Sequence, residues 1–286
     1  MSRVTARRPT LRITSTSQVQ RPDTLAVEEP LELRINGTPL TVTMRTAGDD
    51  VDLAHGFLLS EDIIGSADDI ESARYCTGKD IDGPNTYNVL DVRLRTPAPV
   101  VRRAFLTTSA CGVCGKTALD QVRTRTRFPL NGTGPHVTAG TLASLPEQLR
   151  SYQRVFDVTG GIHAAGLFTS EGAALVVRED VGRHNAVDKV IGWAMRTGRV
   201  PAHDLILIVS GRASFELVQK AVMAGIPILG AVSAPSSLAV DLAAESGLTL
   251  AGFLRGSTMN VYTGAHRVQT DSQFTRPATA RANGTY

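Results

Sequence analysis

The sequence predicts an α/β protein, α+β overall, in which a smaller N-terminal α+β domain precedes a C-terminal α/β layered domain. The first reason is length, because 286 residues suffice for a sizeable core and one or two domains. The second is composition, since 42% apolar but only 5% aromatic residues favour a core of Ala, Val, Leu and Ile. The third is the regular alternation of helix and strand patterns in the second half of the chain.

The N-terminal half begins with a strong β-hairpin signal. Apolar and polar residues alternate over 31–35 and again over 40–44, and Asn36-Gly37 between them supplies the turn. Residues 49–58 then predict a helix that is capped by the two aspartates at its start. Residues 87–94 predict a further strand.

The C-terminal half reads as α-β-β-α-β-α-β-α-β, which predicts a layered domain with a largely parallel sheet. Its first helix is expected over 145–156, because Ser144-Leu145-Pro146-Glu147 has the form of a capping box with proline in the first turn. Short apolar runs such as 205–209 are typical of buried strands.

These patterns set the expected domain boundaries. Residues 1–25 and 269–286 are rich in small and polar residues, arginine and proline, so we expect flexible tails there. The small N-terminal domain is placed at residues 26–105. A connector that contains two cysteines is placed at 106–140, and the layered domain at 141–268.

Composition excludes several classes of protein. A net charge of +3 with a pI of about 8.9 is too mild for a dedicated nucleic-acid binder. No stretch approaches the ~18–20 apolar residues of a membrane span, and polar residues after Arg7-Arg8 exclude an export signal. Three cysteines cannot close a disulfide framework, so we expect a reducing, cytoplasmic location.

Cys111-Gly112-Val113-Cys114 is the most informative motif in the chain. Two cysteines at this spacing serve metal ligation, disulfide exchange or sulfur handling. No second pair of ligands with suitable spacing completes a zinc site, so no bound metal is expected. The pair follows a proline-containing connector instead of opening a βαβ helix, which weakens the thiol oxidoreductase interpretation. Nearby Arg102, Arg103 and Lys116 would favour a reactive thiolate.

Loops after the predicted strands carry glycines, hydroxyls and arginines that suit phosphate groups. In open α/β sheets ligands bind beyond the carboxyl ends of the strands, over helix N-termini. The loops in question are 178–185, 210–214, 233–237 and 253–258. A turn with an N-cap is the alternative for each loop alone. Gly160-Gly161 is a further glycine cluster, for which a plain turn is the alternative.

Several ordered motifs together resemble the FdhD family of formate dehydrogenase accessory sulfur carriers, over roughly residues 25–265. The matching stretches are Leu53 to Glu61, Ser109 to Gly115, Gly160 to Ala165, Glu179 to Lys189, Ser210-Gly211-Arg212, Pro235 to Ala239 and Gly252 to Arg255. The resemblance implies that the layered domain is cytidine-deaminase-like. Zinc-dependent deamination is not expected, because His184-Asn185-Ala186 lacks the glutamate of His-x-Glu and the Pro-Cys-x-x-Cys motif is missing.

The resemblance also implies a function. An IscS-type cysteine desulfurase would pass persulfide sulfur to Cys111, and the chain would deliver it to a molybdenum (or tungsten) bis-guanine-dinucleotide cofactor needed by formate dehydrogenase. Such a carrier has sulfurtransferase-like chemistry, treats the cofactor as bound substrate, and is expected to form a homodimer. Cys114 matches the second cysteine of the family. The cofactor-binding residues are expected to be Phe253, Leu254, Arg255, Gly256, Ser257 and Thr258, with Arg212, His184, Gly160 and Gly161.

Two alternatives stay open at this point. The chain could be a chaperone that only holds the cofactor, with the cysteine pair in a structural or metal-binding role. It could also be a disulfide oxidoreductase that cycles the Cys111–Cys114 couple.

Overall fold

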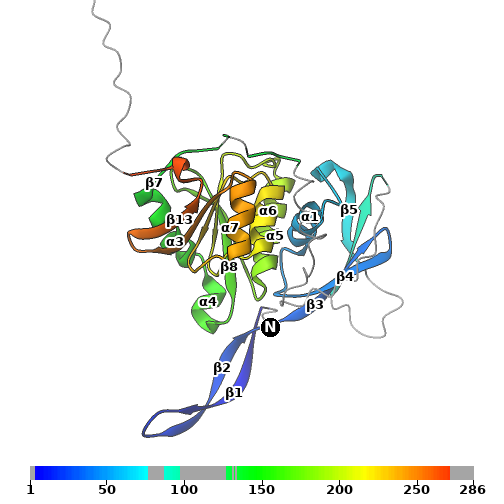
Figure 1. Cartoon of the computed structure of the whole chain (residues 1–286). Coiled ribbons are helices and arrows are strands. Elements are labelled where there is room, and N and C mark those ends of the chain that lie inside the picture. Colours follow the sequence, from blue (N-terminus) through cyan, green and yellow to red (C-terminus); the bar gives the residue numbers. More distant parts are fainter. Residues whose placement is uncertain (1–3, 77–86, 97–126, 131, 133, 271–286) are drawn as a thin grey trace, which may run out of the picture.

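The computed structural model describes residues 4–76, 87–96, 127–130, 132 and 134–270 of the chain. Figure 1 shows a larger and a smaller sheet side by side, with helices between them, and a narrow hairpin that extends away from both. This mixture of helices and sheets confirms the predicted α/β class.

Within the described residues, the larger sheet has six strands in the order β13-β12-β11-β10-β8-β9. The pairs β10–β11 and β11–β12 are parallel, whereas β13–β12, β10–β8 and β8–β9 are antiparallel. The prediction of a largely parallel sheet is therefore wrong. Short turns join β8 to β9 and β12 to β13, and a short turn can connect only antiparallel neighbours. The strands are β8 (His163–Phe168), β9 (Ala174–Asp180), β10 (Ile206–Val209), β11 (Ile228–Ala231), β12 (Thr249–Arg255) and β13 (Thr258–Thr263).

Helices cover both faces of this sheet (Figure 1). On one face, Leu142 and Leu145 of α3 (Ala139–Ser151) belong to an apolar cluster that contains Phe168 of the sheet. The other face is covered by α5 (Arg183–Arg196), α6 (Phe215–Met223) and α7 (Ser237–Glu245), which contribute to a larger apolar cluster.

The first helix of this half begins earlier than predicted. Thr138 is the N-cap of α3, and its hydroxyl oxygen accepts the Thr141 N–H at 3.0 Å. Ser144, which was expected to cap the helix, instead donates its hydroxyl to the Thr141 carbonyl at 2.8 Å. Pro146 therefore lies inside the helix. A break after Ser151 then separates α3 from the short helix α4 (Arg154–Thr159).

The smaller sheet has the order β4-β3-β6-β5 among the described residues. The Asn36-Gly37 turn is confirmed, since both residues have the positive φ values (49° and 80°) that a tight hairpin requires. Leu31, Leu33 and Ile35 of β3 are buried, as their alternation predicted. The strands are β3 (Glu29–Ile35), β4 (Thr38–Arg45), β5 (Ile70–Tyr75) and β6 (Val89–Leu94), and a 3-10 turn, Ala67–Asp69, precedes β5.

Helix α1 (Asp50–Ser60) joins the smaller sheet to the larger one by packing on α5. The two helices approach so closely that only glycine fits at two positions. A Cβ atom on Gly56 would overlap the carbonyl group of Asp188, and one on Gly192 would overlap the carbonyl group of Asp52. The matching glycines therefore fix how the two parts of the chain dock.

Buried ion pairs reinforce this junction. Asp50 does not cap α1 as predicted, because its carboxylate accepts two bonds from the fully buried Arg45 guanidinium, at 3.0 and 2.9 Å. Asp49 is the N-cap residue but makes no side-chain cap bond. On the α5 side, the Lys189 ammonium lies 2.8 Å from Asp180. The Lys189 ammonium also donates to the Thr46 carbonyl at 2.9 Å, and Asp180 accepts the Thr46 N–H at 3.1 Å. This pair is therefore tied to the chain that leaves β4, and loss of either partner would be costly.

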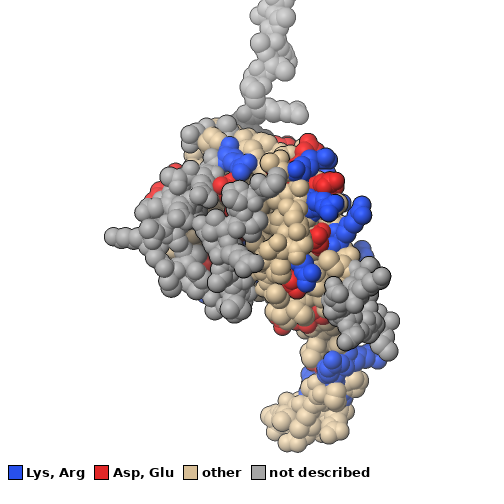
Figure 2. Space-filling view, turned by 90° about the vertical axis from the view of Figure 1, so that its right-hand side faces the viewer, with Lys and Arg blue, Asp and Glu red and all other residues tan. Residues whose placement is uncertain are grey.

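Residues 5–26 form a β-hairpin where the sequence suggested a flexible tail. Strands β1 (Thr5–Ile13) and β2 (Gln18–Ala26) pair with each other along their whole length. Pro9 faces Pro22, so the two residues that lack a backbone N–H donor occupy a single cross-strand pair. At the turn, the Thr14 hydroxyl oxygen accepts the Ser17 N–H at 3.0 Å. On the face shown in Figure 2, charged side chains lie nearer the body than the uncharged end of the hairpin.

A short parallel pair links the two ends of the layered part. Strand β14 (Val268–Gln269), preceded by the 3-10 turn Ala265–Arg267, pairs with β7 (Val137–Thr138) just before α3. In the part of the chain that the structure describes, no helix has the length and apolar character needed to cross a membrane.

Candidate functional site

One edge of the larger sheet collects the loops that the sequence singled out. Strand β9 runs in the same direction as β10, β11 and β12, because β8 pairs antiparallel with both β9 and β10. The carboxyl ends of these four strands therefore meet at one edge, and β8 begins there. This is the edge at which α/β sheets bind ligands.

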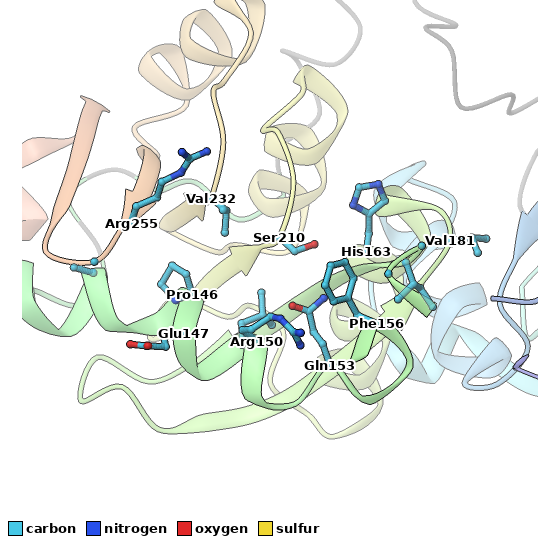
Figure 3. A pocket seen from close by; sticks show the side chains of 16 residues that line it. Pro146, Glu147, Arg150, Gln153, Phe156, His163, Val181, Ser210, Val232 and Arg255 are labelled. Atoms are coloured by element: carbon cyan, nitrogen blue, oxygen red, sulfur yellow. The ribbon is translucent and has the colours of Figure 1, made fainter. Parts of the chain in front are cut away.

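A pocket of about 730 Å³ opens at this edge (Figure 3). It lies between α3 and α4 on one side and the end of the sheet on the other. Among the residues expected to bind the cofactor, Gly160, Gly161, Arg255 and Gly256 line it. Its volume falls in the range of about 300–1,000 Å³ that is usual for small-molecule sites.

The rest of the expected segment surrounds this pocket without lining it. Leu254 is buried in the core beside α3. Ser257 is exposed in the β12–β13 turn, and Thr258 is exposed at the start of β13. Phe253 is 40% exposed and has a φ of +53°, which is rare for an aromatic residue. The irregular register of β12 at this point turns the Phe253 side chain outward instead of into the core.

His184 and Arg212 lie at the same edge but outside the pocket lining. His184 lies in the first turn of α5, and its Nε2 atom lies 3.4 Å from the Ser214 hydroxyl and 3.8 Å from Glu216. Interaction with His184 lowers the pKa of Glu216 to about 2, against an opposing effect of burial. Arg212 is exposed on the loop between β10 and α6.

The helical wall of the pocket contains residues that the sequence patterns did not single out. The Arg150 guanidinium lies 4.6 Å from the centre of the Phe156 ring, and Gln153 lies between the two helices. The Glu179 carboxylate accepts the Val155 and Phe156 N–H groups at 2.9 and 2.8 Å. This contact ties α4 to β9 and so positions the wall. The only sequence signal for this wall is the break between the amphipathic patterns of α3 and α4.

The base of the pocket is polar but uncharged near β8. Burial lowers the pKa of His163, and the nearby Arg183 and His184 lower it further, so the imidazole is neutral at pH 7. The Ser210 hydroxyl oxygen accepts the Ala164 N–H at 2.9 Å and keeps its own proton for another acceptor. Arg255 supplies a positive charge at the opposite end (Figure 3).

Cys111 and Cys114 lie outside the described residues. Cys76, at the end of β5, is a free, partly buried thiol. Among the residues that the structure describes, no three His, Cys, Asp or Glu side chains form a group that could hold a metal ion.

Comparisons with known sequences give a consistent result. The model of the FdhD/NarQ family matches residues 26–269. A protein of Nocardia farcinica named sulfur carrier protein FdhD is 70% identical over 276 residues, which are 96% of this chain and 99% of that protein. A protein of Mycobacterium tuberculosis with the same name is 55% identical over 276 residues, covering 94% of this chain and all (100%) of its own length.

A solved structure has the same fold. The crystal structure of a protein from Desulfotalea psychrophila, described as a formate dehydrogenase accessory protein, superposes with a TM-score of 0.73. The match covers 93% of this chain and 99% of that one, at 22% sequence identity.

Proposed function

Because this chain belongs to the FdhD/NarQ family, we propose that it is a sulfur carrier that serves formate dehydrogenase. The observation that carries this proposal is a family match over residues 26–269, with relatives named sulfur carriers at 55–70% identity. A sulfur-carrier role for formate dehydrogenase is the function that the family resemblance of the sequence implied.

The first chemical step is transfer of sulfur to Cys111. The Cys111 thiolate attacks the terminal sulfur of a persulfide on an IscS-type cysteine desulfurase. A new S–S bond forms on Cys111, the old S–S bond breaks, and the desulfurase cysteine leaves as a thiolate. The chain then holds one extra sulfur atom as a persulfide.

The second step releases this sulfur to the metal of the cofactor, and it needs two electrons. Cys114 can supply them. Its thiolate attacks the inner sulfur of the Cys111 persulfide, a Cys111–Cys114 disulfide forms, and the terminal sulfur leaves as hydrosulfide. The disulfide must then be reduced by a cytoplasmic dithiol before the next cycle. This assigns Cys114 the resolving role.

The substrate that receives the sulfur is the molybdenum bis-guanine-dinucleotide cofactor. Its pyrophosphates are anions, and Arg255 is a cation at the mouth of the pocket, next to the Gly256 backbone. Gly160 and Gly161 lie between α4 and β8 on the opposite side, with nothing within 4 Å of a Cβ on Gly160. A phosphate or sugar can therefore approach this backbone closely.

The proposed partners follow from this chemistry. They are the desulfurase that donates sulfur, formate dehydrogenase, and a second copy of the chain, all in the cytoplasm. Light scattering on the purified protein measures the last of these. A mass of one chain at all concentrations would remove the homodimer from the proposal.

Sulfur loading tests the proposal directly. The protein is incubated with a cysteine desulfurase and cysteine, and its intact mass is measured before and after a reducing agent. The wild-type chain and Cys114→Ser should each gain one sulfur that reductant removes, whereas Cys111→Ala should gain none. Loading of Cys111→Ala to the wild-type level would show that Cys111 is not the carrier.

A further inference from the structure

The β1–β2 hairpin projects from the body of the protein, with little of the described chain packed on it (Figure 1). Its two nine-residue strands pair only with each other among the described residues, and β2 packs on α4 where the hairpin leaves the body. A two-stranded hairpin is at best marginally stable in water, and exposed strand edges readily pair with other chains. The hairpin is therefore expected to be covered by another molecule.

Exposed apolar side chains are concentrated on the hairpin and beside it. Among the described residues, eleven large apolar side chains are exposed, and six of them lie on the hairpin or around the break between α3 and α4. Ile13, near the tip of the hairpin, is 63% exposed. A gathering of this kind indicates a surface that binds a partner. The six residues are Leu11, Ile13, Val19 and Leu25 of the hairpin, with Tyr152 and Val158.

The hairpin is also strongly basic. It carries four arginines against one aspartate, a net charge of +3, which equals the net charge of the whole chain. The strand register places Arg8, Arg12 and Arg21 on one face. Arg12 and Arg21 make no ion pair or side-chain hydrogen bond with any other described residue. Their charge is therefore free to attract an acidic surface.

The hairpin lies next to the wall of the pocket. Helix α4, on which β2 packs, contributes Phe156 to the pocket lining, and Gly160 of the lining directly follows this helix. Val158 of the same helix is exposed. A molecule that covers the hairpin and the exposed side of α4 is therefore placed beside the pocket.

We propose that the hairpin, residues 5–26, is a docking arm for an acidic surface of the enzyme that receives the cofactor. The inference rests on the proposed function, in which the neighbouring pocket holds the cofactor until formate dehydrogenase takes it. The arginines select an acidic surface, and the exposed leucine, isoleucine and valine side chains add apolar contact of the kind that protein interfaces contain. The hairpin has no aromatic residue on which bases could stack, so it suits a protein better than RNA.

The test is binding of purified formate dehydrogenase without its cofactor to the immobilised full-length chain, measured by interferometry at two salt concentrations. The hairpin variant combines Arg12→Gln with Arg21→Gln. The matched control combines Arg74→Gln with Arg93→Gln, because these arginines are also exposed and without side-chain partners among the described residues, but lie on the smaller sheet. Sulfur loading by the desulfurase, mass by light scattering and thermal unfolding are measured on each protein.

We expect the hairpin variant to bind the dehydrogenase about tenfold more weakly than the wild type and with less dependence on salt. Its sulfur loading, mass and melting temperature should be those of the wild type, and the control variant should match the wild type throughout. Equal affinity in the hairpin variant and the wild type would overturn the docking arm and leave the proposed function standing.

Three other results would also overturn it. Loss of sulfur loading in the hairpin variant would make the desulfurase the occupant, and a fall in mass would make it a second copy of the chain. Displacement of the dehydrogenase by mixed-sequence RNA, with RNA binding lost in the hairpin variant, would make it a nucleic acid. If the wild-type chain neither bound the dehydrogenase nor loaded sulfur, the docking arm and the proposed function would both fall.

Discussion

Arg255 combines exposure, positive charge and a place at the pocket mouth. Arg212 shares its charge and sheet edge but lies outside the pocket lining. We predict that Arg255→Ala weakens GDP binding about tenfold, because a charge-assisted hydrogen bond to phosphate is lost. Calorimetry on both variants checks this. If Arg212→Ala cost as much as Arg255→Ala, the phosphates would lie along the outer rim and not in the pocket.

The lowered pKa of Glu216 predicts that the stability of the fold depends on pH. Its pKa in the folded chain is about 2, below the value of 4.5 for a free glutamate, mainly through interaction with His184. The stabilisation is therefore complete above pH 4.5 and is lost as the pH falls toward 2. The His184–Glu216 separation of 3.8 Å is longer than a hydrogen bond, so we expect only about 1 kcal/mol.

Denaturant unfolding of the wild type and Glu216→Gln measures this effect. The difference in unfolding free energy between them should be present at pH 5 and shrink toward zero as the pH falls to about 2. A difference that does not change with pH would mean that the carboxylate charge contributes nothing.

At the residue scale, the sequence grouped residues whose chemistry depends on a single loop. Gly160, Gly161 and Arg255 were expected at a ligand site; the structure places them around one pocket, and their role in binding stays a prediction. Gln153 was not expected, because a lone glutamine between helices has no motif. Its side chain is buried in the pocket wall only because α3 and α4 pack on the sheet.

At the element scale, the crossing of α1 and α5 depends on two glycines. We predict that Gly192→Ala destabilises the protein by about 1–3 kcal/mol or more, because its methyl group meets the Asp52 carbonyl and the helices must separate. Gly161→Ala is the control for stability, since its nearest neighbour would be 3.8 Å away and its φ is ordinary. Equal melting temperatures for the two variants would show that α1 and α5 tolerate a wider spacing.

The β1–β2 hairpin should be dispensable for folding. Its strands pair only with each other among the described residues, and the family match begins at residue 26. We predict that a chain starting at residue 27 melts cooperatively within a few degrees of the full-length protein. Loss of the cooperative transition by circular dichroism would mean that contacts between β2 and α4 hold the body together.

Local sequence signals predicted where helices and strands lie better than they predicted which elements pack against one another. The Asn36-Gly37 turn and the buried run of β10 were predicted because each depends on a few adjacent residues. The direction of β8 was not predicted, because an apolar run does not show whether a strand pairs parallel or antiparallel with its neighbours. The start of α3 was misplaced because Thr138 and Ser144 are both good caps, and the competition between them is settled by packing.

At the scale of the whole molecule, the fold builds a pocket at one edge of the larger sheet and holds the smaller sheet beside it. Four strands that run the same way deliver their loops to one edge, and α3 and α4 close a pocket over it. The packing of α1 on α5 and the hydrogen bonds that Lys189 and Asp180 make with Thr46 hold the smaller sheet against this layer. The order of motifs along the chain predicted the family and the α/β class, but not the wall that makes the pocket.

Transfer of radiolabelled sulfur tests the central claim most directly. Labelled cysteine, a desulfurase, the carrier and formate dehydrogenase that lacks sulfur on its cofactor are mixed, and label on the extracted cofactor is counted together with formate oxidation. The account predicts label and activity with the wild-type chain, and neither with Cys111→Ala. Equal labelling of the cofactor with Cys111→Ala, or with no carrier present, would contradict the claim that sulfur passes through this protein.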